Sequence, residues 1–261
     1  MREGAALVTG GARRLGREMA LALASRGHDI ALHFSGSADD AAATAEDISA
    51  QGVRVELLQA DLTVESEMQA LVARATGALQ KSLSVLINNA SVFEHDTLAG
   101  ATRDSWDRHL ESNLRAPFVL TQHFAAQAQE PEIDGRGEAM ARSAIINMTD
   151  QRVRKLTPEF MSYTLAKSAL WALTQTAARA LAPRVRVNAI GPGPTLKAEQ
   201  QSERHFSSQR AATIMGRGSN PEDIVSAMTY LLDAPAVTGQ MICVDGGQHL
   251  GWQTPDVIGT Q

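Results

Sequence analysis

The sequence predicts an α/β fold: a single doubly wound Rossmann domain whose parallel sheet has about seven strands, with helices on both faces. Three observations support this. Short apolar runs alternate with long segments of helical periodicity, the pattern of βαβ units. Several runs are apolar on consecutive residues, as expected for strands covered on both faces. The length of 261 residues suits one large α/β domain.

The elements follow in order along the chain. The predicted strands are the runs 5–10, 29–34, 53–62, 84–90, 143–148, 185–191 and 240–247. Apolar residues between the first two recur at helical spacing, and further helices are predicted near 39–50, 64–80, 103–129, 159–182 and 221–233. Two segments interrupt this alternation. The polar segment 130–142 indicates a surface excursion, and the connection 191–220 indicates either a substrate or lid loop or a plain surface loop.

Composition excludes several classes of protein. The formal net charge is −5, so nothing overall favours nucleic acid or an anionic membrane. No apolar run approaches the roughly 20 residues that span a bilayer, and the first residues lack a signal-peptide layout. The single cysteine, Cys243, precludes an intrachain disulfide and a cysteine-based zinc cluster, and we expect no metal site. We therefore predict a cytoplasmic protein without nucleic-acid or membrane partners.

The first strand runs into a glycine-rich turn, LVTGGARRLGRE at 7–18. Such a turn presents backbone N–H groups and the positive end of a helix dipole, which suits a pyrophosphate, although a plain tight turn has the same composition. Gly10 and Gly16 are spaced for this role, and Arg14 stands where many such turns have another glycine. Arg13 and Arg14 can be solvated charges or can neutralise phosphate.

The second strand ends in ALHFSGSADD without the acid that usually holds the ribose 2′-hydroxyl of NAD. Ser35 and Ser37 can instead bond a 2′-phosphate, with Arg13 adding charge, or can serve in a turn and an N-cap. This favours NADPH over NADH. After the third strand, Asp61 can contact adenine or cap the next helix. After the fourth, the INNAS turn at 87–91 lets small residues approach the cofactor.

Tyr163 and Lys167 lie four residues apart in YTLAK and therefore on one face of a helix. An ammonium beside a phenol lowers the pKa of the phenol, and such a tyrosine can exchange a proton near neutral pH. An ordinary exposed pair would have the same spacing. The pair follows Asp150, a carboxylate at the end of the strand 143–148, by 13 residues. The polar residues 151–155 beside it form a solvated loop or receive an acidic substrate tail.

Together these motifs make the chain similar to the short-chain dehydrogenase/reductase family over nearly its whole length. The matching pieces are TGGARRLG (9–16), NNA (88–90), Asn113, YTLAK (163–167), RVRVNAIGPGP (184–194) and VTGQMICVDGG (237–247). The resemblance implies hydride transfer with a nicotinamide cofactor. Tyr163 would be the acid, Lys167 would hold the ribose and tune Tyr163, and Asn113 would anchor a water. It also implies a homo-oligomer, a tetramer or dimer, through the helices near 103–129 and 159–182.

The cofactor-binding residues that follow from the motifs and the resemblance come from every strand end in the predicted sheet. They are Gly10, Arg13, Arg14, Leu15, Gly16, Phe34, Ser35, Ser37, Asp61, Leu62, Asn89, Ala90, Ser91, Tyr163, Lys167, Pro192, Gly193 and Thr195.

Three departures from the family pattern resemble one branch, the pteridine and dihydromonapterin or dihydrofolate reductases. Asp150 replaces the usual serine, Ser91 follows NNA in place of glycine, and Arg14 replaces a glycine. In that branch the substrate ring lies between the nicotinamide and an aromatic residue, here Phe93. The resemblance implies that Phe93, Ser91, Arg14, Asp150 and Tyr163 contact the substrate.

Charge complementarity supports this assignment. A carbonyl reductase needs donors to a developing oxyanion, which an ionised Asp150 would repel. An aminopterin presents N–H donors that a carboxylate accepts, and an enclosed carboxyl can have a raised pKa and share a proton with Tyr163. The prediction is an NADPH-dependent reductase of a pterin-like C=N bond. The alternatives are a carbonyl or alcohol reductase of the 3-oxoacyl or keto type and a catalytically idle NADPH-binding sensor.

Overall fold

The structure, a computed structural model, describes residues 4–198 and 201–253. All seven predicted strands form one sheet in the order β3-β2-β1-β4-β7-β8-β9, and every neighbouring pair is parallel. The doubly wound prediction is therefore confirmed. The strands are β1 (Gly4–Val8), β2 (His28–Phe34), β3 (Val55–Gln59), β4 (Val85–Asn88), β7 (Ser143–Met148), β8 (Val185–Pro192) and β9 (Met241–Val244).

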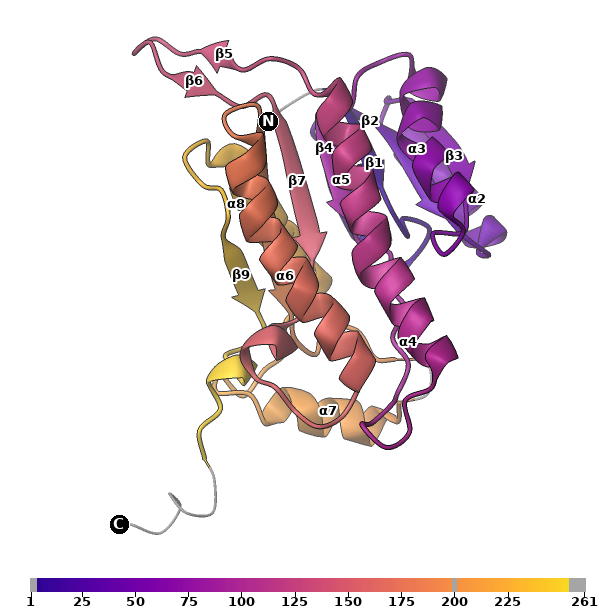
Figure 1. The fold of residues 1–261 in the computed structure, drawn as a ribbon, viewed down its shortest axis with the longest axis vertical. Helices are drawn as coiled ribbons and strands as arrows, with labels where there is room; N and C mark the ends of the chain where they lie inside the picture. The colour runs from indigo at the N-terminus through magenta and orange to yellow at the C-terminus, as the bar shows by residue number, and fades with distance from the viewer. Residues whose placement is uncertain (1–3, 199–200, 254–261) are drawn as a thin grey trace.

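Helices cover both faces of this sheet and enclose two apolar cores. Leu71, Phe124 and Ala177 represent the core under α3, α5 and α6, and Met19 and Met228 the core under α1, α2 and α8. Figure 1 shows α3 and α5 on the near side of the sheet. The helices are α1 (Arg14–Ala24), α2 (Ala38–Ser49), α3 (Glu65–Leu79), α4 (Arg103–Leu110), α5 (Ala116–Gln127), α6 (Met161–Leu181), α7 (Glu203–Ala211) and α8 (Pro221–Asp233).

The helix predicted over 103–129 is interrupted, which corrects the sequence analysis. A π-helical turn, Glu111–Arg115, separates α4 from α5 and contains Asn113. Pro117 explains the break, because it has no N–H to donate to the carbonyl of Asn113 four residues earlier. Such π turns often mark functional positions.

The two segments that interrupt the strand–helix alternation lie at opposite ends of the molecule. The segment 130–142 forms a small antiparallel hairpin, β5 (Glu132–Ile133) with β6 (Ala139–Met140). The connection after β8 contains α7, at the other end of Figure 1; its role as a lid stays a prediction, and residues 199–200 lie outside the described part. Among the described residues, no helix combines the length and the apolar character needed to cross a membrane.

The strand order also fixes where a ligand can bind. From β1 the chain winds outward to β2 and β3, and it then returns to β4 on the opposite side of β1. The connections leave this point in opposite directions and open a crevice at the carboxyl ends of the strands. Gly10, Asn89 and Asp150 follow β1, β4 and β7 closely and so reach the same crevice.

Candidate active site

A cavity of about 660 Å³ opens at this crevice. Phe93 and Asn113 are the two predicted site residues that do not line it. The predicted residues that line the cavity are Gly10, Arg13, Arg14, Leu15, Gly16, Phe34, Ser35, Ser37, Asp61, Leu62, Asn89, Ala90, Ser91, Asp150, Tyr163, Lys167, Pro192, Gly193 and Thr195. Lining residues that the sequence analysis missed are Ala12, His33, Gly36, Thr63, Val92, Ser112, Met148, Thr149 and Leu196.

The glycine-rich turn depends on close backbone approach. A Cβ atom at Gly16 would lie 2.1 Å from the carbonyl oxygen of Gly10, and Gly10 has a φ of +61°. The Asn89 side chain donates to the carbonyl oxygens of Thr9 (2.9 Å) and Gly10 (3.0 Å). The NNA turn therefore holds the glycine turn in place, and both glycines are required by geometry.

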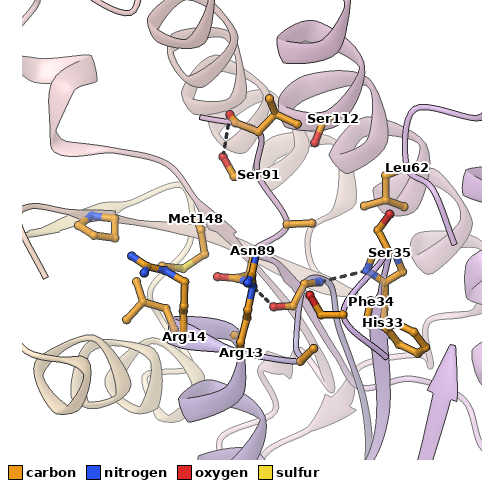
Figure 2. Close-up of a pocket in the computed structure, with 18 of the residues that line it drawn as sticks. Arg13, Arg14, His33, Phe34, Ser35, Leu62, Asn89, Ser91, Ser112 and Met148 are labelled. Carbon is orange, nitrogen blue, oxygen red and sulfur yellow. Dashed lines mark hydrogen bonds between the residues drawn. The ribbon is translucent and has the colours of Figure 1, made fainter. Parts of the chain in front are cut away.

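His33, which the sequence analysis passed over, fastens the turn to β2. Its Nδ1 accepts the Gly10 N–H at 3.0 Å, so its Nε2 must carry the proton that is donated to the Ala60 carbonyl, also at 3.0 Å. Burial lowers the pKa of His33 to about 4. A neutral imidazole thus ties the end of β2 to the segments that follow β1 and β3. Figure 2 shows His33 and Arg14 on opposite sides of Asn89.

The end of β2 suits a 2′-phosphate better than a free ribose 2′-hydroxyl. The cavity residues from 33 to 37 are His, Phe, Ser, Gly and Ser, and none of these five is acidic. Ser37 stands at the N-cap of α2, yet its side chain makes no cap hydrogen bond, so capping does not use the hydroxyl. Asp61 does not cap α3, whose N-cap residue is Val64; its Oδ1 accepts from the N–H and hydroxyl of Thr63 at 2.9 and 2.7 Å, and its contact with adenine stays a prediction.

Arg14 lies across Asn89 from His33 (Figure 2). Its φ of +55° is in a backbone region that residues other than glycine rarely adopt. Its guanidinium donates to the carbonyl oxygens of Leu196 (3.2 Å) and Lys197 (2.9 Å). Arg14 therefore links the glycine turn to the connection between β8 and α7. Its predicted contact with phosphate or substrate stays a prediction.

Asp150 and Tyr163, which both line the cavity, are hydrogen-bonded to each other. The Tyr163 hydroxyl donates to Asp150 Oδ2 at 2.9 Å, and the backbone N–H of Arg152 donates to Oδ1 at 2.8 Å. Burial raises the pKa of Asp150, although these hydrogen bonds oppose the shift. A carboxyl with a raised pKa that is bonded to a phenol is suited to sharing a proton with it.

Lys167 is close to Tyr163 but does not have the predicted effect on it. Its Nζ lies 5.7 Å from the centroid of the Tyr163 ring and donates to the Met148 carbonyl at 2.7 Å. Burial raises the pKa of Tyr163 well above its usual value, and the charge of Asp150 adds to the rise. The expected lowering of the pKa of Tyr163 was therefore wrong for this structure. Burial also lowers the pKa of Lys167 to about 8.

Asn113 and Phe93 are not part of the cavity lining but are next to residues that are. The Asn113 amide donates to the Val92 carbonyl at 2.8 Å and accepts the Val92 N–H at 2.9 Å. Its side chain thus supports the segment that carries Phe93. The Phe93 ring stacks on Phe160 with the ring centroids 4.4 Å apart and makes a T-shaped contact with Tyr163 at 4.7 Å, while 48% of Phe93 stays exposed.

The polar residues after Asp150 form a 3₁₀ turn, Gln151–Arg154, at the rim of the site. Arg152 donates to the Thr157 hydroxyl at 2.6 Å and lies 5.0 Å above the Phe160 ring. Arg154 and Lys155 are exposed. Because Gln151 is buried and Arg152 half-buried, only the end of this segment agrees with a solvated loop, and an acidic substrate tail stays a prediction.

A family model described as enoyl-(acyl carrier protein) reductase matches residues 10–249. The chain belongs to the short-chain dehydrogenase/reductase family. This oxidoreductase family includes the 3-oxoacyl-[acyl-carrier-protein] reductase FabG of Staphylococcus epidermidis, which is 31% identical over 250 residues, 94% of this chain and 98% of FabG. An uncharacterised oxidoreductase of Mycobacterium tuberculosis is 35% identical over 93% of this chain and 90% of its own.

Solved short-chain dehydrogenase/reductase structures are similar as well. FolM alternative dihydrofolate reductase 1 from Brucella suis, in complex with NADP, is 40% identical with a TM-score of 0.89, covering 97% of this chain and 98% of its own. The angucycline C-6 ketoreductase LanV with bound NADP is 28% identical with a TM-score of 0.84, covering 96% of this chain and 99% of its own. Relatives thus include both a dihydrofolate reductase and ketoreductases.

Proposed function

We propose that this protein is an NADPH-dependent reductase of a pterin-like C=N bond, such as that of a dihydropteridine or dihydrofolate. The observation that carries the proposal is the 2.9 Å hydrogen bond from the Tyr163 hydroxyl to the Asp150 carboxyl. Reduction of an imine requires a proton on nitrogen, and here the proton-donating phenol is paired with a carboxyl whose pKa is raised by burial. The FolM structures, at 40% and 38% identity, support the same substrate class.

The cavity fits a nicotinamide dinucleotide. The glycine turn supplies the close backbone approach that a pyrophosphate needs, since a Cβ atom at Gly10 would lie only 3.0 Å from the Cα of Ala90. Ser35 and Ser37 line the cavity at the end of β2, where residues 33–37 include no acid to contact a ribose hydroxyl. NADP in the FolM and LanV complexes supports NADPH over NADH.

Each site residue then has a distinct task. NADPH, when bound, supplies the hydride to the carbon of the C=N bond. Tyr163 delivers the proton to the nitrogen, and Asp150 accepts N–H bonds from the ring and holds the proton shared with the phenol. Lys167, a buried residue of α6 that donates to the Met148 carbonyl at the end of β7, contacts the ribose side. The side-chain oxygen and nitrogen of Asn113 are both bonded to Val92. The backbone carbonyl of Asn113 is therefore the group left to anchor a water.

Carbonyl reduction is the second candidate, favoured by the FabG relatives. In that reaction Tyr163 would protonate an alkoxide oxygen, and Asp150 would recognise a donor on the substrate. An ionised Asp150 beside a developing oxyanion raises the barrier, whereas a protonated Asp150 can donate to it. The two candidates therefore differ in the protonation state that Asp150 needs.

A substrate panel separates the candidates. Purified protein is mixed with NADPH or NADH and with a dihydropteridine, dihydrofolate or an acetoacetyl thioester, and the loss of absorbance at the nicotinamide band is followed. We expect kcat/KM for the pterins with NADPH to exceed that for the thioester by at least about 100-fold. A higher kcat/KM for the thioester would assign the carbonyl reaction, and tight NADPH binding without turnover would assign the sensor.

We also propose that the protein forms a homo-oligomer, a tetramer or dimer, through α4, α5 and α6. These helices expose large apolar side chains, including Trp106, Phe118 and Leu165. Such residues on long helices are suited to a helix-to-helix interface.

A further inference from the structure

A buried polar network lies behind the active site and joins three elements. It consists of Asp96, His109 and Ser162, which are 5%, 0% and 0% exposed. We propose that His109 is a positioning residue that fixes Phe93 for substrate stacking, an inference that deepens the proposed function and rests on it. The sequence analysis singled out none of the three residues.

The hydrogen bonds of this network have one consistent direction. The Glu94 N–H donates to His109 Nε2 at 3.2 Å, so the imidazole proton must lie on Nδ1. Nδ1 then donates to the Ser162 hydroxyl at 2.6 Å, and this hydroxyl donates to Asp96 Oδ2. Because both ring nitrogens are hydrogen-bonded, the neutral imidazole acts as a spacer of fixed length between Glu94 and Ser162. Burial lowers the pKa of His109, in agreement with a neutral ring.

The network explains how Phe93 is held. The residue before it, Val92, is bonded through both backbone groups to Asn113, and the residue after it, Glu94, is bonded to His109. Asn113 and His109 are four residues apart, across the junction of α4 and the π turn. Phe93 is thus fixed on both sides by one helical region. It presents one ring face to Phe160 and leaves nearly half of its surface open.

Asp96 connects the same segment to the helix that carries Tyr163. Its Oδ1 accepts the Ser162 N–H at 3.2 Å, and its carbonyl accepts the Phe160 N–H at 2.8 Å. Although burial acts to raise the pKa of Asp96, the hydrogen bonds from Ser162 lower it. An ionised Asp96 at the first turn of α6 also interacts favourably with the helix dipole. The distance between Phe93 and Tyr163 is therefore set by buried polar contacts on both sides.

Two matched substitutions test the hydrogen bonds of the two imidazole nitrogens one at a time. His109→Gln places an amide oxygen near the position of Nε2 and keeps an acceptor for the Glu94 N–H. His109→Asn places its amide near the position of Nδ1, keeps the bond to Ser162 and abandons Glu94. We expect H109N to raise the KM of the pterin about tenfold, with kcat and the NADPH Kd within about twofold of wild type. H109Q is expected to keep a near-normal KM. Equal effects of the two variants on KM, or an effect of H109N on kcat alone, would overturn the proposal.

A second readout does not require turnover. The chain has six phenylalanines, so 4-fluorophenylalanine labelling gives a ¹⁹F spectrum in which Phe93→Leu identifies the Phe93 signal. We expect that signal to move or broaden in H109N and to keep its position in H109Q. An unchanged signal in H109N refutes the positioning role whatever the substrate is. If no pterin is reduced but the signal moves as expected, the proposed function fails while the positioning role stands.

Discussion

The two halves of the cavity are built in different ways. The nucleotide half rests on backbone groups and a neutral side chain: Gly16 packs on the Gly10 carbonyl, and His33 accepts the Gly10 N–H. The substrate half rests on titratable side chains, with Asp150 bonded to Tyr163 and Lys167 bonded to the Met148 carbonyl. Burial shifts the pKa of each of these three groups.

This difference indicates a division of labour. Backbone geometry that depends on glycine can hold a cofactor with little dependence on pH, whereas buried acids and bases make the substrate half sensitive to protonation. Substitutions of Asp150 or Tyr163 in the substrate half should therefore reduce turnover while cofactor binding persists. Substitutions around the glycine turn should change folding stability or cofactor affinity.

The largest effect is expected at Tyr163. Tyr163→Phe removes the proton donor but keeps the ring that makes the T-shaped contact with Phe93. We expect kcat to fall by roughly 10³-fold, within the range typical of a general acid, with the NADPH Kd changed less than about threefold. Single-turnover kinetics and a fluorescence titration of NADPH measure the two quantities. A parallel loss of NADPH affinity would show that the halves are not separable.

In the nucleotide half, His33 gives an acid-sensitive contribution to folding. Its folded pKa of about 4 lies below the ordinary 6.5, so between these values the unfolded chain binds more protons than the folded one. The free energy of unfolding should fall as the pH drops from 6.5 to 4, by roughly 3 kcal/mol. His33→Asn keeps an acceptor for the Gly10 N–H and does not titrate. Denaturant unfolding at several pH values should show that the free energy of unfolding depends less steeply on pH in H33N than in wild type. An equal dependence on pH would contradict the low pKa assigned to His33.

The smallest effect is expected at Arg14. Arg14→Gly relieves the positive φ, a gain of about 1 kcal/mol, but loses the exposed hydrogen bonds to Leu196 and Lys197. We expect the free energy of unfolding to change by less than about 1 kcal/mol while the NADPH Kd rises about threefold to tenfold, because a cation beside the glycine turn is lost. Arg14→Lys, which keeps the charge, is the matched control for calorimetry and titration. An unchanged Kd in the glycine variant would remove Arg14 from the cofactor site.

Much of the fold could be predicted because its signals are local. Seven apolar runs gave seven strands, and the glycine turn and Tyr163 with Lys167 were recognised from spacing. The break at Asn113 was missed, although Pro117 was visible in the sequence and is the physical reason for it. The segment 130–142 was predicted as a polar excursion, and its pairing as a hairpin depends on backbone bonds that composition does not show.

The remaining site features depend on contacts between distant residues. His33 reaches Gly10 across 23 residues, and His109 reaches Ser162 across 53, so neither partner is visible from local spacing. The pKa of Tyr163 was predicted in the wrong direction because the prediction rested on the ammonium of Lys167 and left out the burial of Tyr163 and the charge of Asp150, which dominate. Long-range burial, rather than motif identity, decides these protonation states.

Asp150 tests the central claim most directly. The measurement is the ratio of kcat/KM for a dihydropteridine to kcat/KM for an acetoacetyl thioester, with NADPH, in wild type, Asp150→Ser and Asp150→Asn. We predict that D150S lowers the ratio by at least about 100-fold, since serine supplies an oxyanion donor but no carboxylate. D150N keeps the size of the side chain and should also lose pterin reduction. An unchanged ratio in D150S, with the NADPH Kd intact, would contradict the account.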